Sequence, residues 1–107
     1  MKLTIEIKAK DGKFQELYQT LYALLPSVRK QKGCLDCRIY KDSEDDNIFF
    51  LSFDWEDQSV LDYFLRSNSG SAFLGAVEVL GETSRVKIGN AESSHGIDVL
   101  KRMRKET

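Results

Sequence analysis

Cys34 and Cys37 stand in a Cys-x-x-Cys spacing, which is typical of redox pairs and of half a zinc site. A redox pair normally lies at a helix N-terminus, where the dipole lowers the thiol pKa, whereas these residues begin a predicted strand. Residues three apart on a strand point to opposite faces, which argues against a disulfide and against joint chelation. A zinc site also needs four ligands, and two Cys with a single His fall short. We therefore expect two structural thiols and no metal.

His95 is the only histidine in the chain. It lies before Gly96, in a stretch that is typical of a linker leading to a helical tail. We expect an exposed loop residue. The alternative is a catalytic role, which requires that the tail fold over the pocket of a partner.

Several aromatic side chains are expected to converge on the layer between a sheet and its helices. Most of them are interpreted as hydrophobic core, and the set is Tyr18, Tyr22, Phe53, Trp55, Phe64 and Phe73. Trp55 differs, because the indole N–H of a strand-end tryptophan needs a hydrogen-bond partner. Core packing and pocket lining are equally favoured for it. An aromatic pocket would bind flat hydrophobic rings. Proton transfer would then fall to Tyr or Asp, and the sequence singles out no catalytic residue.

The pattern in the first half of the chain predicts a strand, a helix and two further strands. Residues 2–8 alternate polar and apolar side chains, which predicts a half-buried strand. From Phe14 to Val28 the apolar period is helical, with Pro26 inside it and Gly33 as the expected stop. Strands are predicted over 35–40 and 48–55, joined by an acidic turn.

The second half supplies two helical pieces, a strand and a tail helix. Asp57 is a candidate cap for a helix over 60–65, Asn68-Ser69-Gly70 breaks it, and a second piece covers 72–80. A fourth strand follows around 86–88, and 97–105 has helical spacing. The order predicts a ferredoxin-like α+β fold, β-α-β-β-α-β, with a four-stranded antiparallel sheet and both main helices on one face. Residues 1–90 form this domain, and 91–107 form a linker and a helical tail.

The uncovered face of such a sheet predicts self-association. Phe50 and Tyr40 fall on that face, and two sheets packed face to face would bury them in a two-fold dimer. A monomer that tolerates a few exposed aromatics is the alternative. The formal net charge of −1 favours neither nucleic acid nor an anionic membrane as a partner. No signal or membrane segment is evident, so we expect a cytoplasmic protein.

Short stretches resemble the antibiotic biosynthesis monooxygenase (ABM) superfamily of dimeric α+β barrel proteins. Gly33-Cys34-Leu35 with Ile39-Tyr40-Lys41-Asp42 is similar to the family's strand entry and exit. The strand from Phe50 to Trp55 and the helix that follows, with Ser59-Val60-Leu61, Leu65-Arg66-Ser67 and Phe73, complete the resemblance over roughly residues 1–90.

The resemblance implies a pocket between sheet and helices, with Trp55 at it, and oxidation of quinols, anthrones or other electron-rich aromatics without metal or flavin. We expect the substrate to bind at Trp55, Phe64, Phe73, Tyr22 and Leu51. Phe64 stands where many members carry His, and a phenyl ring can neither transfer a proton nor ligate iron. Leu51 stands where some active members are polar.

The resemblance and the residues together leave three functions open. The first is a cofactor-independent monooxygenase that acts with dioxygen on a quinol or a similar small aromatic molecule, as a homodimer. The second is a non-catalytic small-molecule binding or regulatory protein on the same dimeric fold, which Phe64 and Leu51 favour. A purely structural or interaction role through the tail is the third alternative.

Overall fold

The structure is a computed structural model that describes residues 1–93 and 96–105, so His95 lies outside the described residues. Its elements are β1 (Lys2–Ala9), α1 (Phe14–Arg29), β2 (Cys34–Lys41), β3 (Ile48–Trp55), α2 (Gln58–Arg66), α3 (Asn68–Leu80), β4 (Gly81–Ile88), β5 (Ala91–Ser93) and α4 (Asp98–Lys105).

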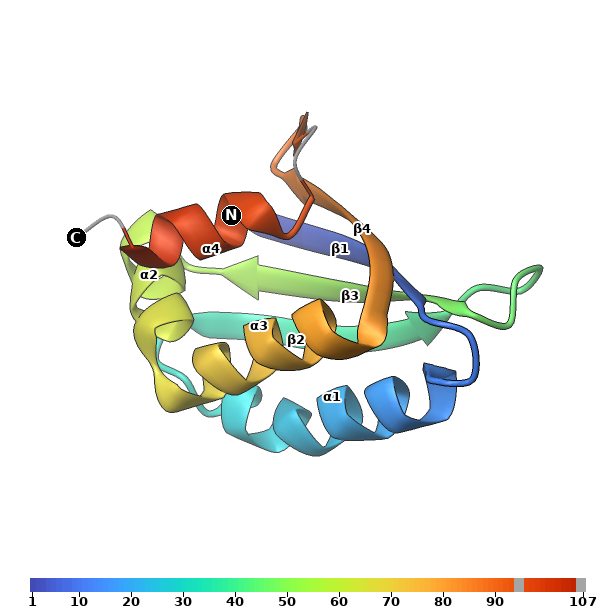
Figure 1. Cartoon of the computed structure of the whole chain (residues 1–107). Coiled ribbons are helices and arrows are strands. Elements are labelled where there is room, and N and C mark those ends of the chain that lie inside the picture. The colour runs from blue at the N-terminus through green and yellow to red at the C-terminus, as the bar shows by residue number, and fades with distance from the viewer. Residues whose placement is uncertain (94–95, 106–107) are drawn as a thin grey trace.

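The strands form one antiparallel sheet in the order β2-β3-β1-β4-β5. Helices α1 and α3 lie across one face of it, and α4 lies beyond them next to α2 (Figure 1). This confirms the predicted ferredoxin-like arrangement with a C-terminal helix. The three-residue β5 is an addition, which pairs with the end of β4 and extends that edge.

The core lies between the sheet and the helices. β1 is the central strand, and its alternate residues Leu3, Ile5 and Ile7 are buried, as the period-two pattern predicts. In α1 the buried residues are Leu17, Leu21, Leu25 and Val28, which share one helical face. The helix ends at Arg29, four residues before the expected stop at Gly33. Gly33 instead has φ +84° and passes so close to α2 that a Cβ there would lie 2.6 Å from a Val60 methyl carbon.

The two helices after β3 meet at Ser67. Asp57 caps α2 by accepting a hydrogen bond from the backbone N–H of Val60 at 3.1 Å, as predicted. Ser67 ends α2 and begins α3, because its hydroxyl accepts from the Gly70 N–H at 3.1 Å. The helix is therefore interrupted at Ser67 and not, as predicted, at Asn68-Ser69-Gly70. Those three residues form the first turn of α3.

A β-bulge at Leu35 overturns one expectation about β2. Cys34 pairs with Trp55, and the next pair joins Asp36 to Asp54, so Leu35 is an extra residue in the ladder. Because of this extra residue, side chains three positions apart at this point of β2 lie on the same face of the sheet rather than on opposite faces. Cys34 and Cys37 consequently lie on the same, helix-facing side of the sheet, and Leu35 is 65% exposed.

Candidate functional site

Four aromatic rings pack together where β3 ends and α2 and α3 begin to cover the sheet. Trp55 stacks on Phe64 at 5.0 Å between ring centroids and on Phe53 at 5.9 Å. Phe73 meets the edge of Phe53 at 6.0 Å and lies 6.4 Å from Phe64. We call Phe53, Trp55, Phe64 and Phe73 the sealed aromatic cluster, because none of the four is more than 3% exposed.

The indole nitrogen of Trp55 has no hydrogen-bond partner among the described residues. Trp55 is 0% exposed, and its Nε1 is the one buried side-chain nitrogen or oxygen of the described residues that is left unpaired. An unpaired buried donor costs about 1–3 kcal/mol of stability relative to a paired one. Such a cost is tolerated where a ligand or water supplies the acceptor. The cluster therefore presents one unused donor among aromatic faces.

The two remaining residues expected to bind substrate differ in burial. Leu51 is buried at 1% exposure, on the same face of β3 as Phe53 and Trp55. Tyr22 is 59% exposed, so the expectation that it joins the layer between sheet and helices is wrong. It follows the buried Leu21 by one position, and one residue turns a helix by about 100°, which points Tyr22 outward.

The two thiols are free, and across the β2–β3 ladder Cys34 pairs with Trp55 and Cys37 with Phe53 of the cluster. Burial raises the pKa of Cys37 to about 12, and burial also raises the pKa of the less buried Cys34. Arg29 donates from Nε to the Cys37 carbonyl at 3.0 Å, which fixes the backbone rather than activating the sulfur. Both sulfurs are neutral thiols at neutral pH, as structural cysteines are.

The sealed cluster holds no acid or base. No charged or polar residue of the described chain is fully buried. The indole N–H can donate a hydrogen bond but cannot accept a proton. The chemical groups of the cluster are therefore limited to aromatic faces and one hydrogen-bond donor.

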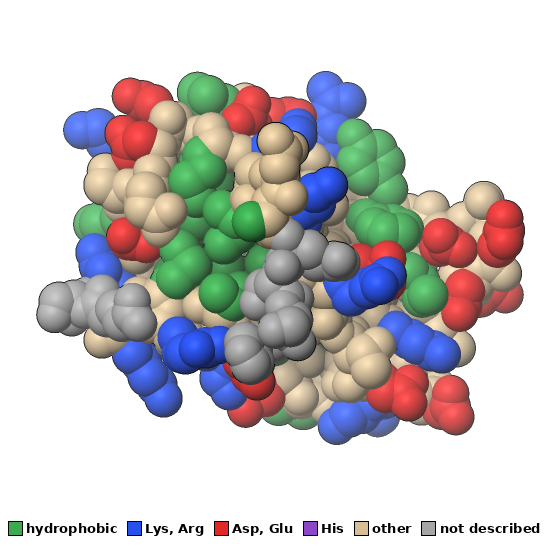
Figure 2. All heavy atoms as spheres, turned by 90° about the horizontal axis from the view of Figure 1, so that it is seen from above, with side chains coloured by type: hydrophobic (Ala, Val, Ile, Leu, Met, Phe, Trp, Pro, Cys, Tyr) green, Lys and Arg blue, Asp and Glu red, His purple; other side chains and the backbone are tan. Residues whose placement is uncertain are grey.

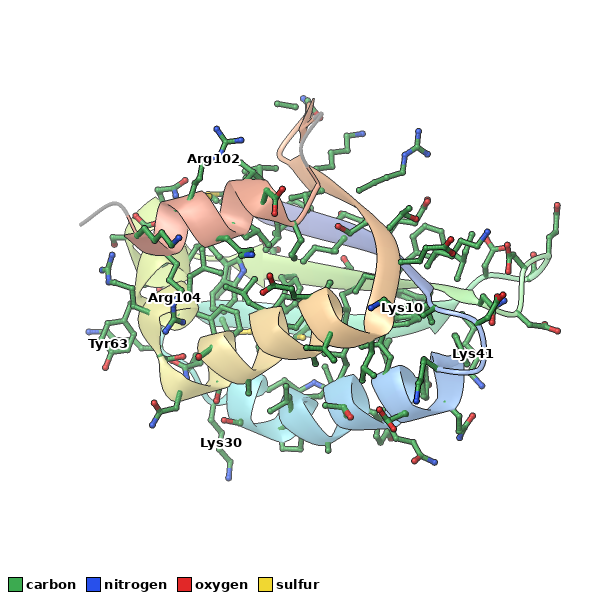
Figure 3. All side chains as sticks on the ribbon, viewed as in Figure 1. Lys10, Lys30, Lys41, Tyr63, Arg102 and Arg104 are labelled. Atoms are coloured by element: carbon green, nitrogen blue, oxygen red, sulfur yellow. The ribbon has the colours of Figure 1, made fainter. Side chains whose placement is uncertain are left out.

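A second aromatic group lies at the other end of β3, and we call it the open aromatic group. Phe14, Tyr18 and Tyr22 stack along α1 with centroid separations of 5.7 and 6.1 Å, and Phe49 meets the first two edge-on. The Lys41 ammonium lies 4.8 Å from the Tyr18 centroid, beside the start of α1 (Figure 3). Phe49 is buried at the base of this group, whereas Tyr22 is exposed to solvent and Lys41 supplies a cation.

Sequence reasoning missed the residues that join the tail helix to this site. Leu100 of α4 is 0% exposed and belongs to the same core as Trp55. Arg104 donates from Nη1 to the backbone carbonyl of Leu65, next to Phe64 in α2. The helical spacing predicted α4 itself, but spacing does not indicate which element a helix packs against.

The fold defines a ferredoxin-like α+β protein. The family model for antibiotic biosynthesis monooxygenase matches residues 1–77, and the chain belongs to this ABM family. Proteins of this family are typically dimeric. No helix within 1–93 or 96–105 has the length and apolar character required to cross a bilayer.

Solved structures of similar proteins share this fold. One from Pseudomonas aeruginosa is 24% identical, with TM-score 0.75, covering 80% of this chain and 87% of its own. A conserved protein from Methanosarcina mazei is 24% identical, with TM-score 0.71 and coverage of 80% and 86%. A structure described as an antibiotic biosynthesis monooxygenase is 16% identical, with TM-score 0.76 and coverage of 84% and 96%. No curated protein matches the chain.

Proposed function

We propose that this protein is a cofactor-independent monooxygenase that oxidises a quinol or another electron-rich aromatic molecule with dioxygen. The observation that carries the proposal is the unpaired Nε1 of Trp55 inside a closed group of aromatic rings, in a member of the ABM family. A ligand that satisfies both features is a flat ring with an oxygen acceptor at its edge, and a quinol has this shape.

The cluster would act on such a ring by stacking and by one hydrogen bond. The ring inserts beside Trp55 and Phe64, whose own stacked pair separates to admit it. The indole N–H then donates to one quinol oxygen. This bond is stronger to an ionised oxygen than to a neutral one, so it favours the quinolate, the form that reduces dioxygen.

The reaction balances without a resident redox group. A naphthoquinol and one dioxygen give a hydroxynaphthoquinone and one water. The aromatic substrate supplies the four electrons, one oxygen atom forms a new C–O bond on its ring, and the other leaves as water with two hydrogens. The chain positions the substrate and keeps bulk water away.

The proton has to leave the quinol without help from a buried side chain. Because no described charged or polar residue is buried at the cluster, the substrate's own ionisation controls the rate. The value of kcat/KM should therefore rise with pH up to the pKa of each quinol. Quinols of different acidity should give correspondingly displaced profiles, which an enzyme-borne base would not.

Binding without catalysis is the second candidate, and Phe64 favours it. Its ring takes the place of the family's His, and together with Leu51 and Phe73 it leaves the cluster without proton-transferring or iron-binding groups. The same geometry then retains a quinone-like ligand as a sensor or carrier would. Haem degradation through an axial His is disfavoured for the same reason.

The active form is a homodimer that pairs the outer faces of two sheets. On that face Phe50 is half-buried beside Tyr40, its cross-strand partner, which is 49% exposed. Glu6 of β1 is the other cross-strand neighbour of Phe50, and Arg85 of β4 lies beyond it, with 4.0 Å between Arg85 Nη1 and Glu6 Oε2. A second copy packed on this face would bury the two rings.

Trp55 is the single tryptophan, so its fluorescence tests the proposal directly. We would titrate naphthoquinols, anthrones and haem anaerobically, then admit oxygen and follow its uptake. Saturable quenching with oxygen uptake and hydroxyquinone formation supports the monooxygenase. Saturable quenching without turnover supports the binding protein. Absence of quenching by every ligand contradicts both.

A further inference from the structure

A ligand cannot reach Trp55 unless part of the protein moves. The indole is 0% exposed, and Phe64 and Phe73, which flank it, are 1% and 3% exposed. The sheet and α1 are poor candidates for this movement. β1 is hydrogen-bonded on both sides, and four buried side chains along sixteen residues anchor α1.

Helix α4 is anchored by fewer buried side chains than α1. It has eight residues, and Leu100 is its one fully buried side chain among those described. Figure 3 shows Arg102 pointing away from the molecule and Arg104 pointing down toward α2. Seen from above, a group of hydrophobic side chains lies exposed on this side of the molecule, with basic side chains around it (Figure 2).

Among the described residues, three polar contacts hold α4 and its first turn, and each reaches a different element. Arg104 donates to the Leu65 carbonyl in α2, and Lys101 pairs with Glu78 of α3 at 2.8 Å. At its start, the Ile97 N–H donates to the Ser84 hydroxyl of β4 at 2.9 Å. The Lys101–Glu78 pair is exposed at its Glu78 end, and exposed pairs contribute little.

The chain enters α4 through a glycine that touches β4. Gly96 has φ +56°, and a Cβ added to it would lie 2.4 Å from the Ser84 carbonyl oxygen. The close approach seats the start of α4 against the sheet. A residue with a side chain would lift the backbone from Ser84 and break the bond from Ile97.

We propose that α4 is a hinged lid, pivoting at Gly96, whose release from α2 opens the sealed aromatic cluster. α4 lies against α2, and α2 carries Phe64, the ring that covers Trp55. Eight residues are too few for a stable isolated helix in water, so release also unwinds the segment and the closed state predominates. The identity of the entering ligand rests on the proposed function, whereas the lid itself does not.

Two glycines with the same backbone strain provide the first test. Gly89 has φ +61° and nothing within 4 Å of an added Cβ, so Gly89→Ala carries the strain without the collision. Acrylamide quenching of Trp55 should rise about fivefold or more in Gly96→Ala, the factor expected when a closed state loses a contact of ordinary strength. It should stay near the wild-type value in Gly89→Ala.

Two arginines of α4 provide the second test, and they leave the backbone unchanged. Arg104→Ala removes the bond to Leu65, and Arg102→Ala removes the same charge from the outward side. Hydrogen exchange of the Leu100 and Lys101 amides should accelerate about tenfold in Arg104→Ala, and quenching should rise with it. Urea unfolding confirms that the global fold is retained in each variant.

The outcomes of these experiments distinguish a failure of the lid proposal from a failure of the proposed monooxygenase function. Faster exchange in α4 with unchanged quenching of Trp55 overturns the lid, as does unchanged exchange in both Gly96→Ala and Arg104→Ala. If quenching responds as expected but no quinol binds to any variant, the lid stands and the proposed function fails. If quinols bind and their association rate constant rises in Arg104→Ala but not in Arg102→Ala, both stand.

Discussion

The sealed aromatic cluster and the open aromatic group occupy opposite ends of one strand, and they differ in what surrounds the rings. At one end Trp55 is closed in by Phe64 and keeps an unpaired N–H. At the other end Tyr22 is 59% exposed, and Lys41 lies over the ring of Tyr18. Aromatic stacking alone therefore does not mark a site. The sealed end is distinguished by a polar atom that its own protein leaves unsatisfied.

Removing one aromatic ring from each end of the strand should give the largest difference in the free energy of unfolding. Phe64→Ala should lower the free energy of unfolding by about 3–5 kcal/mol, because the buried ring leaves a cavity. Tyr22→Ala should lower it by less than about 1 kcal/mol, since most of that side chain is already in water. Urea titration measures both, and similar losses would mean that the two ends do not differ in packing.

Trp55→Phe tests the unpaired donor. If the indole N–H binds the quinol oxygen, kcat/KM should fall by roughly 100-fold, the loss typical of removing one donor from a developing oxyanion. Stability should change by less than about 2 kcal/mol, because losing an unsatisfied donor offsets the smaller ring. Oxygen uptake provides the measurement, with Tyr22→Phe as the control expected to retain full activity. An active Trp55→Phe protein would remove the tryptophan from the mechanism.

Cys37 reports on burial at the sealed end through the pH dependence of stability. Burial raises its pKa to about 12, above the ordinary value of 9.0 that the unfolded chain has. The folded state thus holds the proton more tightly, and this contribution is present below pH 9 and is lost as pH rises toward 12. The free energy of unfolding should fall by about 1 kcal/mol more between about pH 9 and 10 in the wild type than in Cys37→Ala. Equal slopes would show that the thiol is accessible.

Lys41→Met gives the smallest expected effect, at the open end. The ammonium lies 4.8 and 5.8 Å from the Tyr18 and Phe14 centroids, at an exposed site where a cation–π contact contributes about 0.5–1 kcal/mol. We expect stability to fall by that amount and oxygen uptake to be unchanged. Reduced turnover in this variant would place function at the open aromatic group instead.

Local patterns in the sequence determine most of the helices and strands. The alternation of Leu3, Ile5 and Ile7 predicts a buried strand, and Asp57 marks a helix start that its hydrogen bond from Val60 confirms. The order of these elements was enough for the ferredoxin-like fold. Each signal comes from neighbours in the chain, because strand and helix periods depend on residues within one or two turns.

The tertiary structure decided what the site is. The bulge at Leu35 shifts the register of β2 against β3, and this shift places Cys34 and Cys37 on one face. Likewise the sequence identified Trp55 as a tryptophan in need of a partner, but only the packing of rings such as Phe64 around it decided that its N–H is enclosed and unpaired among the described residues. Both depend on contacts between residues far apart in the chain, which no local spacing encodes.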